Sequence, residues 1–326
     1  MEQHKVPSQQ NVAVFGEALI DLIEQPDGQF QPYIGGSPFN VALAMARFGL
    51  ASHYLAPIST DEMGLRIKAY AEKEQVILPT NISSNRNTSL ALVYKDANGQ
   101  PDYSLYRSLV ADLDISVEKL TANLPSDLKV FHTGSLALRP EMATTLTEVF
   151  GYLTHKNINI SIDINMRKCI PEEESAYIAS VKQLMLHATY LKVSDEDLDA
   201  LGANGEYLAY CQQLLHQGNI KLIAFTQGAD GATLLTANQN CFLPAITPAQ
   251  LADTVGAGDT YFAAMLAYLV RNQLISVDAA DFTQAQLSKI NSCAAIAASI
   301  NVSRHGCNPP NFAEVTEFAQ CHNMQV

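Results

Sequence analysis

Residues 253–260 read Asp-Thr-Val-Gly-Ala-Gly-Asp-Thr, and a run rich in Ala, Leu and Met follows to Leu269. This pattern predicts a helix whose first turn, at Gly256, Ala257 and Gly258, leaves backbone N–H groups bare. Bare N–H groups and the helix dipole together favour an anion. Asp259 would then direct its carboxylate at the bound group, an arrangement that suits phosphoryl transfer. The glycines alone favour an ordinary glycine-rich loop. Their combination with Asp253 and Asp259 favours a functional site.

Composition limits the classes of protein to consider. The chain has 326 residues, 48% hydrophobic and 16% charged, with a formal net charge of −13. These values predict a compact globular fold, taken here as one α/β domain over residues 1–326, and argue against nucleic acid as a partner. Six cysteines without a paired spacing and eight scattered histidines indicate a reducing compartment and no structural metal site. Without an N-terminal signal sequence or an apolar membrane span, a soluble, cytoplasmic protein is expected.

The N-terminal part holds a second group of candidate residues. Residues 11–16 are typical of a buried first strand. Asp21 follows among aliphatic residues and fits two interpretations: the polar phase of a strand, or a carboxylate that accepts hydrogen bonds from hydroxyl groups. Residues 35–40 read Gly-Gly-Ser-Pro-Phe-Asn, where the glycine pair lets a ligand approach the backbone and the proline suits a helix start. We expect that helix to end at Gly49. A glycine turn before a packing helix is the weaker alternative.

A small β-sheet is predicted apart from the main layer. The segments 89–94 and 103–106 alternate in character, and the turn residues 96–99 between them indicate a hairpin. With two earlier strands they would form a sheet from about residues 17–35 and 88–110. Arg107 follows the last of these strands. A position on the surface is the usual expectation for an arginine.

The later half alternates between strand and helix patterns. Strands are expected at 128–134, 159–165, 190–194 and 221–226, and helices at 141–155, 175–187, 206–217 and 287–300. This alternation predicts a parallel sheet covered on both faces, with ligands at the carboxyl ends of the strands. The chain has neither G-x-x-x-x-G-K-[ST] nor a G-x-G-x-x-G after its first strand, which argues against a P-loop kinase and a nicotinamide dehydrogenase.

Two motifs resemble one family. Residues 253–262 are similar to the C-terminal signature of the ribokinase-like (PfkB) sugar kinases, and residues 35–42 to their N-terminal motif G-G-x-x-x-N-x-A. The resemblance extends over about residues 11–318. It implies a ribokinase-like three-layer α/β/α sandwich with a mostly parallel sheet and a small β-sheet lid, which forms a dimer surface in many relatives. It also implies that Asp259 is the catalytic base and that the amides of residues 256–258 form the anion hole.

The resemblance assigns further residues to the sugar side. The element D-x-N-x-R at 163–167 makes Arg167 a clamp for the migrating phosphate and turns Asn165 towards the substrate. The pattern Y-R-x-x-x-A-D around Arg107 is similar to that of fructokinases. The implied sugar contacts are Asp21, Gly35, Gly36, Asn40 and Arg107.

The nucleotide side is implied in the same way. Where the family carries N-x-x-E, this chain has Ser194 and Asp197, so how the magnesium hydration shell is held stays open, and a helix N-cap explains these residues equally well. The implied nucleotide-binding residues are Lys192, Ser194, the loop residues Thr226, Gly228 and Gly231, and Asn291 at the adenine pocket. The carbonyls of Asp253 and Val255, with the segment 303–307, are implied to house a monovalent cation.

These inferences lead to a specific expectation. The resemblance implies an ATP- and Mg²⁺-dependent kinase, most like fructokinases, that phosphorylates fructose at O6, with K⁺ as a further cofactor and a homodimer through the lid. A 2-keto-3-deoxygluconate kinase is the nearest alternative, and adenosine and phosphosugar kinases are further off. A sugar-binding regulator without catalytic activity is the alternative from another class.

Overall fold

The main sheet has eight strands. The first six of them in chain order run parallel to one another. The computed structural model describes residues 10–95, 101–167, 171–275 and 282–326. The predicted turn at 96–99, Cys169 and the first nine residues lie outside these ranges. Across the sheet the order is β14 (Asn240–Leu243), β13 (Ala232–Leu235), β12 (Leu222–Thr226), β11 (Tyr190–Ser194), β10 (Asn159–Asp163), β9 (Val130–Gly134), β1 (Asn11–Val14) and β4 (Ala51–Tyr54). The mostly parallel sheet is confirmed.

The two strands at one edge were not predicted. β13 pairs antiparallel with β12, and β14 pairs antiparallel with β13. The chain reverses direction after β12 at Gly231. This residue has a φ of 123°, a backbone conformation that is strained for residues with a side chain, and its carbonyl accepts the N–H of Gln227 at 2.9 Å. β13 and β14 have four residues each, and no helix separates them from β12, so the strand–helix alternation did not reveal them.

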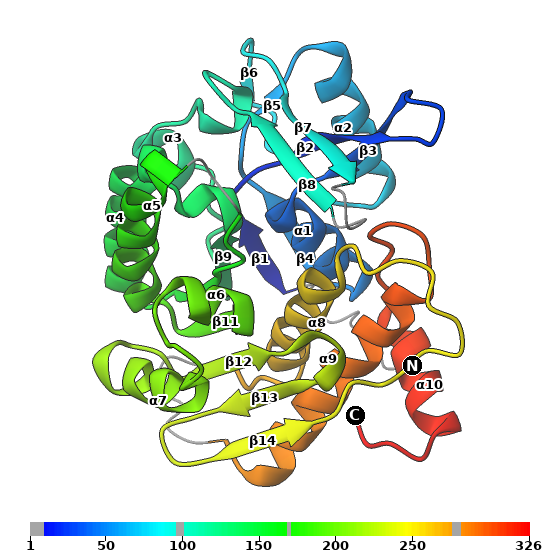
Figure 1. Cartoon of the computed structure of the whole chain (residues 1–326). Helices are drawn as coiled ribbons and strands as arrows, with labels where there is room; N and C mark the ends of the chain where they lie inside the picture. The colour runs from blue at the N-terminus through cyan, green and yellow to red at the C-terminus, as the bar shows by residue number, and fades with distance from the viewer. Residues whose placement is uncertain (1–9, 96–100, 168–170, 276–281) are drawn as a thin grey trace, which may run out of the picture.

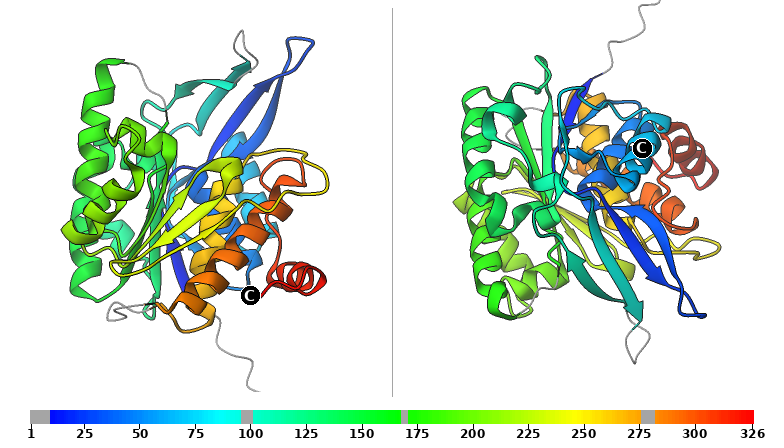
Figure 2. Two further views of the ribbon diagram at one scale, coloured as in Figure 1. Left: turned by 60° about the horizontal axis from the view of Figure 1, so that its bottom comes forward. Right: turned by 90° about the horizontal axis from the view of Figure 1, so that it is seen from above.

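Helices cover both faces of the main sheet, as a three-layer sandwich requires (Figures 1 and 2). One face carries α4 (Pro140–His155), α5 (Pro171–Leu184) and α7 (Tyr207–Gln217), and the other carries α1 (Ser37–Arg47), α8 (Ala257–Arg271), α9 (Gln284–Val302) and α10 (Phe312–Cys321). The remaining helices are α2 (Glu62–Lys73), α3 (Val117–Thr121) and α6 (Asp195–Ala200), with 3₁₀ turns η1 (Ala111–Leu113), η2 (Ser135–Leu138), η3 (Met185–His187) and η4 (Gly228–Asp230).

A separate four-stranded sheet projects from the main body at the top of Figure 1. We call it the small sheet. Its order is β3 (Phe30–Gly35), β2 (Leu19–Glu24), β7 (Ser89–Lys95) and β8 (Pro101–Tyr106). Only β2 and β7 are parallel. A minor pair of two-residue strands, β5 (Ile58–Ser59) and β6 (Ser83–Ser84), completes the strands of the described residues.

Two helix starts meet in the middle of the molecule. α8 is buried from Asp259 to Val270 and packs against both α1 and α9. Its many alanines allow this, because small side chains let neighbouring helices approach closely. α1 begins after Gly36, with Pro38 in its first turn, and ends before Gly49 as predicted. The N-termini of α1 and α8 therefore lie together.

Candidate active site

The carboxylate of Asp259 is fixed by residues from α1. Asp259 is 5% exposed, in the first turn of α8. Ser37 donates its hydroxyl to Oδ1 at 2.7 Å, and the amide nitrogen of Asn40 donates to Oδ2 at 2.8 Å. Asn165 in turn donates to the Ser37 hydroxyl oxygen at 2.9 Å. The structure thus brings together Asn40, Asn165 and Asp259: Asn40 bonds Asp259 directly, and Asn165 is linked to it through Ser37.

Ser37 is a functional candidate that sequence reasoning missed. It lies three residues before Asn40, and positions three apart share one face of a helix. That spacing within the motif was the available signal. With both carboxylate oxygens accepting a hydrogen bond, Asp259 is held in one orientation as an acceptor.

The turn before α8 has the shape expected of an anion site. Gly256 is left-handed, with a φ of 72°, and an added Cβ would come 2.4 Å from the Sγ of Cys307. The N–H of Ala257 donates to the Thr254 carbonyl at 3.2 Å. The following N–H groups have no acceptor within the helix, because the first turn of any helix lacks one. A cradle from which side chains are excluded fits a phosphate group.

A buried ion pair lies directly behind this turn. The Nζ of Lys192 is 2.8 Å and 3.1 Å from the two carboxylate oxygens of Asp163. Burial raises the pKa of Asp163 to about 6, the nearby acids Asp259 and Asp197 act in the same direction, and Lys192 opposes the rise. Burial would lower the pKa of Lys192, but the carboxylates around it, Asp163 first, hold it above its ordinary value. Lys192, which is predicted to contact the nucleotide, is therefore engaged with the carboxylate of Asp163.

Next to this pair, His132 is neutral. Burial lowers its pKa to about 3, and the charge of Lys192 acts in the same direction. Its Nδ1 lies 3.0 Å from the Ser161 hydroxyl.

Ser194 and Asp197 form the N-cap of α6. The Ser194 hydroxyl accepts the Asp197 N–H at 3.0 Å, and Asp197 accepts the Ser194 N–H at 2.9 Å, which is a capping box. The other oxygen of Asp197 accepts the N–H of Met166 at 2.7 Å. This bond ties down the loop after β10 that carries Asn165 and Arg167. Of the two interpretations of this segment, the structure displays the cap.

Asp21 and Arg167 interact electrostatically. Burial raises the pKa of Asp21 to about 6, and the positive charge of Arg167 acts against that rise. Burial would lower the pKa of Arg167, but nearby acids, Asp259 foremost, raise it. Arg167 therefore lies within electrostatic reach of both carboxylates. A Cβ on Gly35 would come 2.1 Å from the Oδ2 of Asp21, so the first glycine of the pair makes room for this carboxylate.

Arg107 lies at the base of the small sheet. It forms a buried ion pair with Asp112, and its Nη1 donates to the Leu136 carbonyl at 3.4 Å. Asp112 also accepts a hydrogen bond from the Ser89 hydroxyl. These bonds tie the small sheet to η1 and η2. Arg107 is thus largely engaged with protein groups, and its role as a sugar contact stays a prediction.

The predicted nucleotide loop lies at the carboxyl end of β12. Thr226 and Gln227 are half-buried, whereas Gly228 is exposed at a φ of 51°. A Cβ at Gly231 would come 2.2 Å from the Leu243 carbonyl oxygen. The backbone is therefore accessible near Gly228, and only glycine fits at position 231 without a clash.

Asn291 has a packing role in the structure. Its amide nitrogen donates to the carbonyls of Ala232 and Cys241 at 3.1 Å and 2.9 Å, and its oxygen accepts the Tyr261 hydroxyl at 2.8 Å. Its side chain thus joins α9 to β13 and β14, and a place beside the adenine pocket stays a prediction.

The loop that precedes α8 is held by hydrogen bonds. Asp253 accepts the N–H groups of Val255 and Gly306 at 3.0 Å and 2.9 Å, and the Val255 carbonyl accepts from the Asn301 amide at 2.9 Å. The segment after α9 is therefore joined to this loop, and a cation site at the carbonyls of Asp253 and Val255 stays a prediction. Among the described residues, no cluster of three or more His, Cys, Asp or Glu side chains could hold a metal ion.

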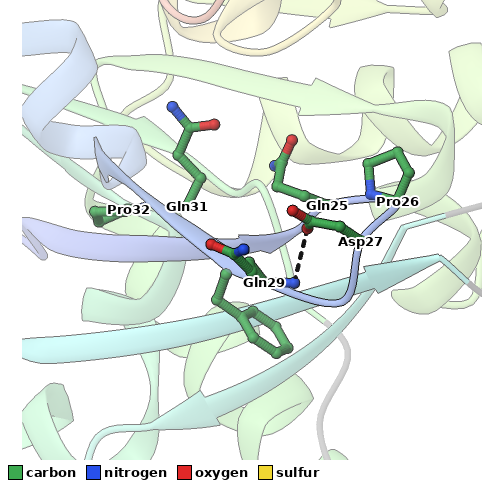
Figure 3. Close-up of a pocket in the computed structure, with 7 residues that line it drawn as sticks. Gln25, Pro26, Asp27, Gln29, Gln31 and Pro32 are labelled. Carbon is green, nitrogen blue, oxygen red and sulfur yellow. Dashed lines mark hydrogen bonds between the residues drawn. The ribbon is translucent and has the colours of Figure 1, made fainter.

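A surface hollow of about 590 Å³ lies elsewhere, at the tip of the β2–β3 hairpin. Residues of the turn and of the start of β3 line it, and Asp27 accepts the Gln29 N–H there at 3.0 Å (Figure 3). None of the candidate site residues borders this hollow, so we assign it no part in the site.

The fold and the site together define a class of protein. Residues 9–313 match the pfkB family of carbohydrate kinases, and the chain belongs to that family. It is 31% identical to the fructokinase of Rhizobium leguminosarum bv. trifolii over 268 residues, or 80% of each chain. It is 27% identical to fructokinase-2 of Solanum lycopersicum, over 91% of this chain and 92% of that one.

Solved structures agree. The fructokinase with bound ATP from Xylella fastidiosa has a TM-score of 0.83 and 26% identity, covering 96% of this chain and 98% of that one. A double mutant of the Vibrio cholerae O395 fructokinase, solved with fructose, ADP and potassium ion, has a TM-score of 0.80 at 23% identity and shares the fold. The predicted family and fold class are confirmed. No helix within the described ranges is long and apolar enough to cross a membrane.

Proposed function

We propose that this chain is an ATP-dependent fructokinase that transfers the γ-phosphoryl group to O6 of D-fructose, giving fructose 6-phosphate. The relatives named fructokinase support the sugar, and the ATP in the Xylella structure supports the donor. The observation that carries the proposal is the carboxylate of Asp259, fixed by Ser37 and Asn40 at the mouth of a helix whose N–H groups suit a phosphate.

The proposed reaction follows from this arrangement. Asp259 accepts the O6 proton as the bond between O6 and phosphorus forms and the bond to the ADP oxygen breaks. Ser37 and Asn40 keep the carboxylate aimed at the hydroxyl, so little reorganisation is needed. The N–H groups at the start of α8 and the charge of Arg167 stabilise the transferred group. Mg²⁺, when bound to the β- and γ-phosphates, neutralises part of their charge.

The sugar would lie between the small sheet and the start of α1. Asp21 would accept hydrogen bonds from sugar hydroxyls, and the backbone at Gly35 and Gly36 allows close approach. In this proposal the small sheet is the lid of a single domain that spans residues 1–326. Monovalent cation binding by the carbonyls of Asp253 and Val255 is part of the same proposal.

We propose in addition that the enzyme is cytoplasmic and forms a homodimer through the small sheet. Large apolar side chains on that sheet support the dimer: Phe30, Tyr33 and Tyr106 are 39%, 44% and 57% exposed. A second copy would cover them. Sedimentation of the full chain tests this, and a monomer at micromolar concentration would count against it.

The function is tested with Asp259→Asn and a panel of sugars in a coupled assay of ADP release. We expect fructose to be the preferred acceptor and kcat to fall by about 10²–10⁴ in the variant, with the KM for fructose nearly unchanged. Asp199→Asn, an exposed acid bonded to Tyr207, is the control and should keep full activity.

Each other outcome has a clear meaning. Preference for 2-keto-3-deoxygluconate would replace the substrate and keep the mechanism. Near-normal turnover by Asp259→Asn would remove the assigned base. Sugar binding without ADP release from any acceptor would indicate a regulator instead of an enzyme.

A further inference from the structure

Lys192 reaches from β11 to the back of the anion-binding turn. A Cβ built on Gly258 would lie 3.2 Å from both Cε and Nζ of Lys192. No atom of Asp163 lies within 4 Å of the same point. The positive end of the buried ion pair therefore faces the turn, and its negative end faces away. Gly258 is the second residue of α8, immediately before Asp259.

The ammonium of Lys192 is fixed and shielded from solvent. Lys192 is 4% exposed, and Asp163, which holds it, is fully buried. Acids on three elements act on it: Asp163 at the end of β10, Asp197 in α6 and Asp259 in α8. His132 is a further titratable neighbour, and it is neutral. An ion pair with a purely structural role would not require the Lys192 ammonium to lie directly behind Gly258.

From this geometry we propose that Lys192 is a positioning residue for phosphoryl transfer. Its ammonium adds a full positive charge to the helix end at Gly258, where the dipole alone supplies about +0.5, and it acts without touching the nucleotide. The inference rests on the proposed kinase function and departs from the sequence-based expectation that Lys192 binds the cofactor directly.

A low-dielectric setting makes such a charge effective. The attraction between a fixed cation and the charge that develops on the transferred group is weakly screened when water is excluded. Because the ammonium is held in place before substrate binds, it costs no reorganisation in the reaction. Its effect should therefore appear in kcat, whereas a direct nucleotide contact would also set the affinity for ADP.

The test uses Lys192→Met and the double variant Lys192→Met/Asp163→Leu in the full-length protein. The double variant removes both charges and leaves no buried carboxylate without a partner, so it should fold even if the single variant does not. We expect kcat to fall by about 10² in each variant, and the KM for ATP and the Kd for ADP to change by less than about threefold.

Ser161→Ala is the matched control. Ser161 is buried in the same layer and bonds His132, but it carries no charge. This variant should lose some thermal stability and keep its kcat, which separates disturbed packing from lost charge.

Three results would overturn the proposal. One is a double variant with wild-type kcat, because Lys192 would then only neutralise Asp163. Another is a Kd for ADP that rises in proportion to the loss of activity, which indicates direct contact. The third is a kcat in Ser161→Ala as low as in Lys192→Met. Failure of the kinase function itself is distinct, since wild-type protein would then release no ADP with any sugar.

Discussion

Glu17 should make the protein less stable as the pH rises from about 4.5 to about 7, and Glu17→Gln should remove this effect. The side chain is 2% exposed, where the chain passes from β1 to the small sheet. Burial raises its pKa from an ordinary 4.5 to about 7, although the charge of Arg107 opposes the rise. The folded state therefore favours the neutral carboxyl.

The size of the effect follows from the pKa change. Between pH 4.5 and 7 the folded protein binds more protons at this site than the unfolded chain does. Stability therefore decreases as the pH rises across that interval and levels off above it. A change of about 2.5 pKa units corresponds to about 3 kcal/mol over the whole range, of which about 2–3 kcal/mol falls between pH 5 and pH 8.

Urea unfolding at pH 5 and pH 8 measures this difference. The chain has no tryptophan, so circular dichroism is the suitable signal. We expect Glu17→Gln to gain about 2–3 kcal/mol over wild type on going from pH 5 to pH 8. Glu317→Gln, at an exposed position, should show no such gain. An advantage of Glu17→Gln that is the same at both pH values would refute the reasoning.

The remaining predictions concern the sugar side. The carboxyl of Asp21 protonates as the pH falls through about 6, so the KM for fructose should be about tenfold higher at pH 5 than at pH 7.5; Asp21→Asn should bind poorly at both, and a flat wild-type profile would contradict the assignment. Gly35→Ala should raise this KM at a cost of about 1 kcal/mol or less in stability, because its Cβ would displace only the Asp21 side chain. Gly36→Ala should cost about 2–4 kcal/mol, because φ is 111° and the Cβ would lie 2.3 Å from the Glu17 carbonyl oxygen. Equal losses of stability in the two glycine variants, measured by thermal unfolding, would show that this distinction is wrong.

Local signals made much of the fold predictable. Glycine and proline positions mark the start and end of α1, and the small residues before Asp259 mark the start of α8. β11 spans Tyr190–Ser194 as expected. Each of these features depends on neighbours within a few residues, which is the information that periodicity and capping rules use.

The hydrogen-bond partners could not be found in this way. Ser37 and Asn40 lie 222 and 219 residues from Asp259, and only the folded chain brings them together. The same limit applies to Arg107, for which the resemblance to fructokinases implied a sugar contact, whereas the fold supplies Asp112 as its partner. The sequence shows which polar side chains are present. Only the packed fold determines which atoms they bond to.

The charge of the site illustrates why whole-chain values say little about a bound ligand. A chain with 33 acidic and 20 basic side chains would repel ATP if its charge were spread evenly. Lys192, however, is buried behind the start of α8, and the half-buried Arg167 lies within electrostatic reach of Asp259. The field over a few ångströms is then set by the helix end, these two cations and the carboxylates beside them, because distant surface charges are screened by salt within about 10 Å. An acidic protein can therefore hold a phosphate group, provided that its cations are buried where that group lies.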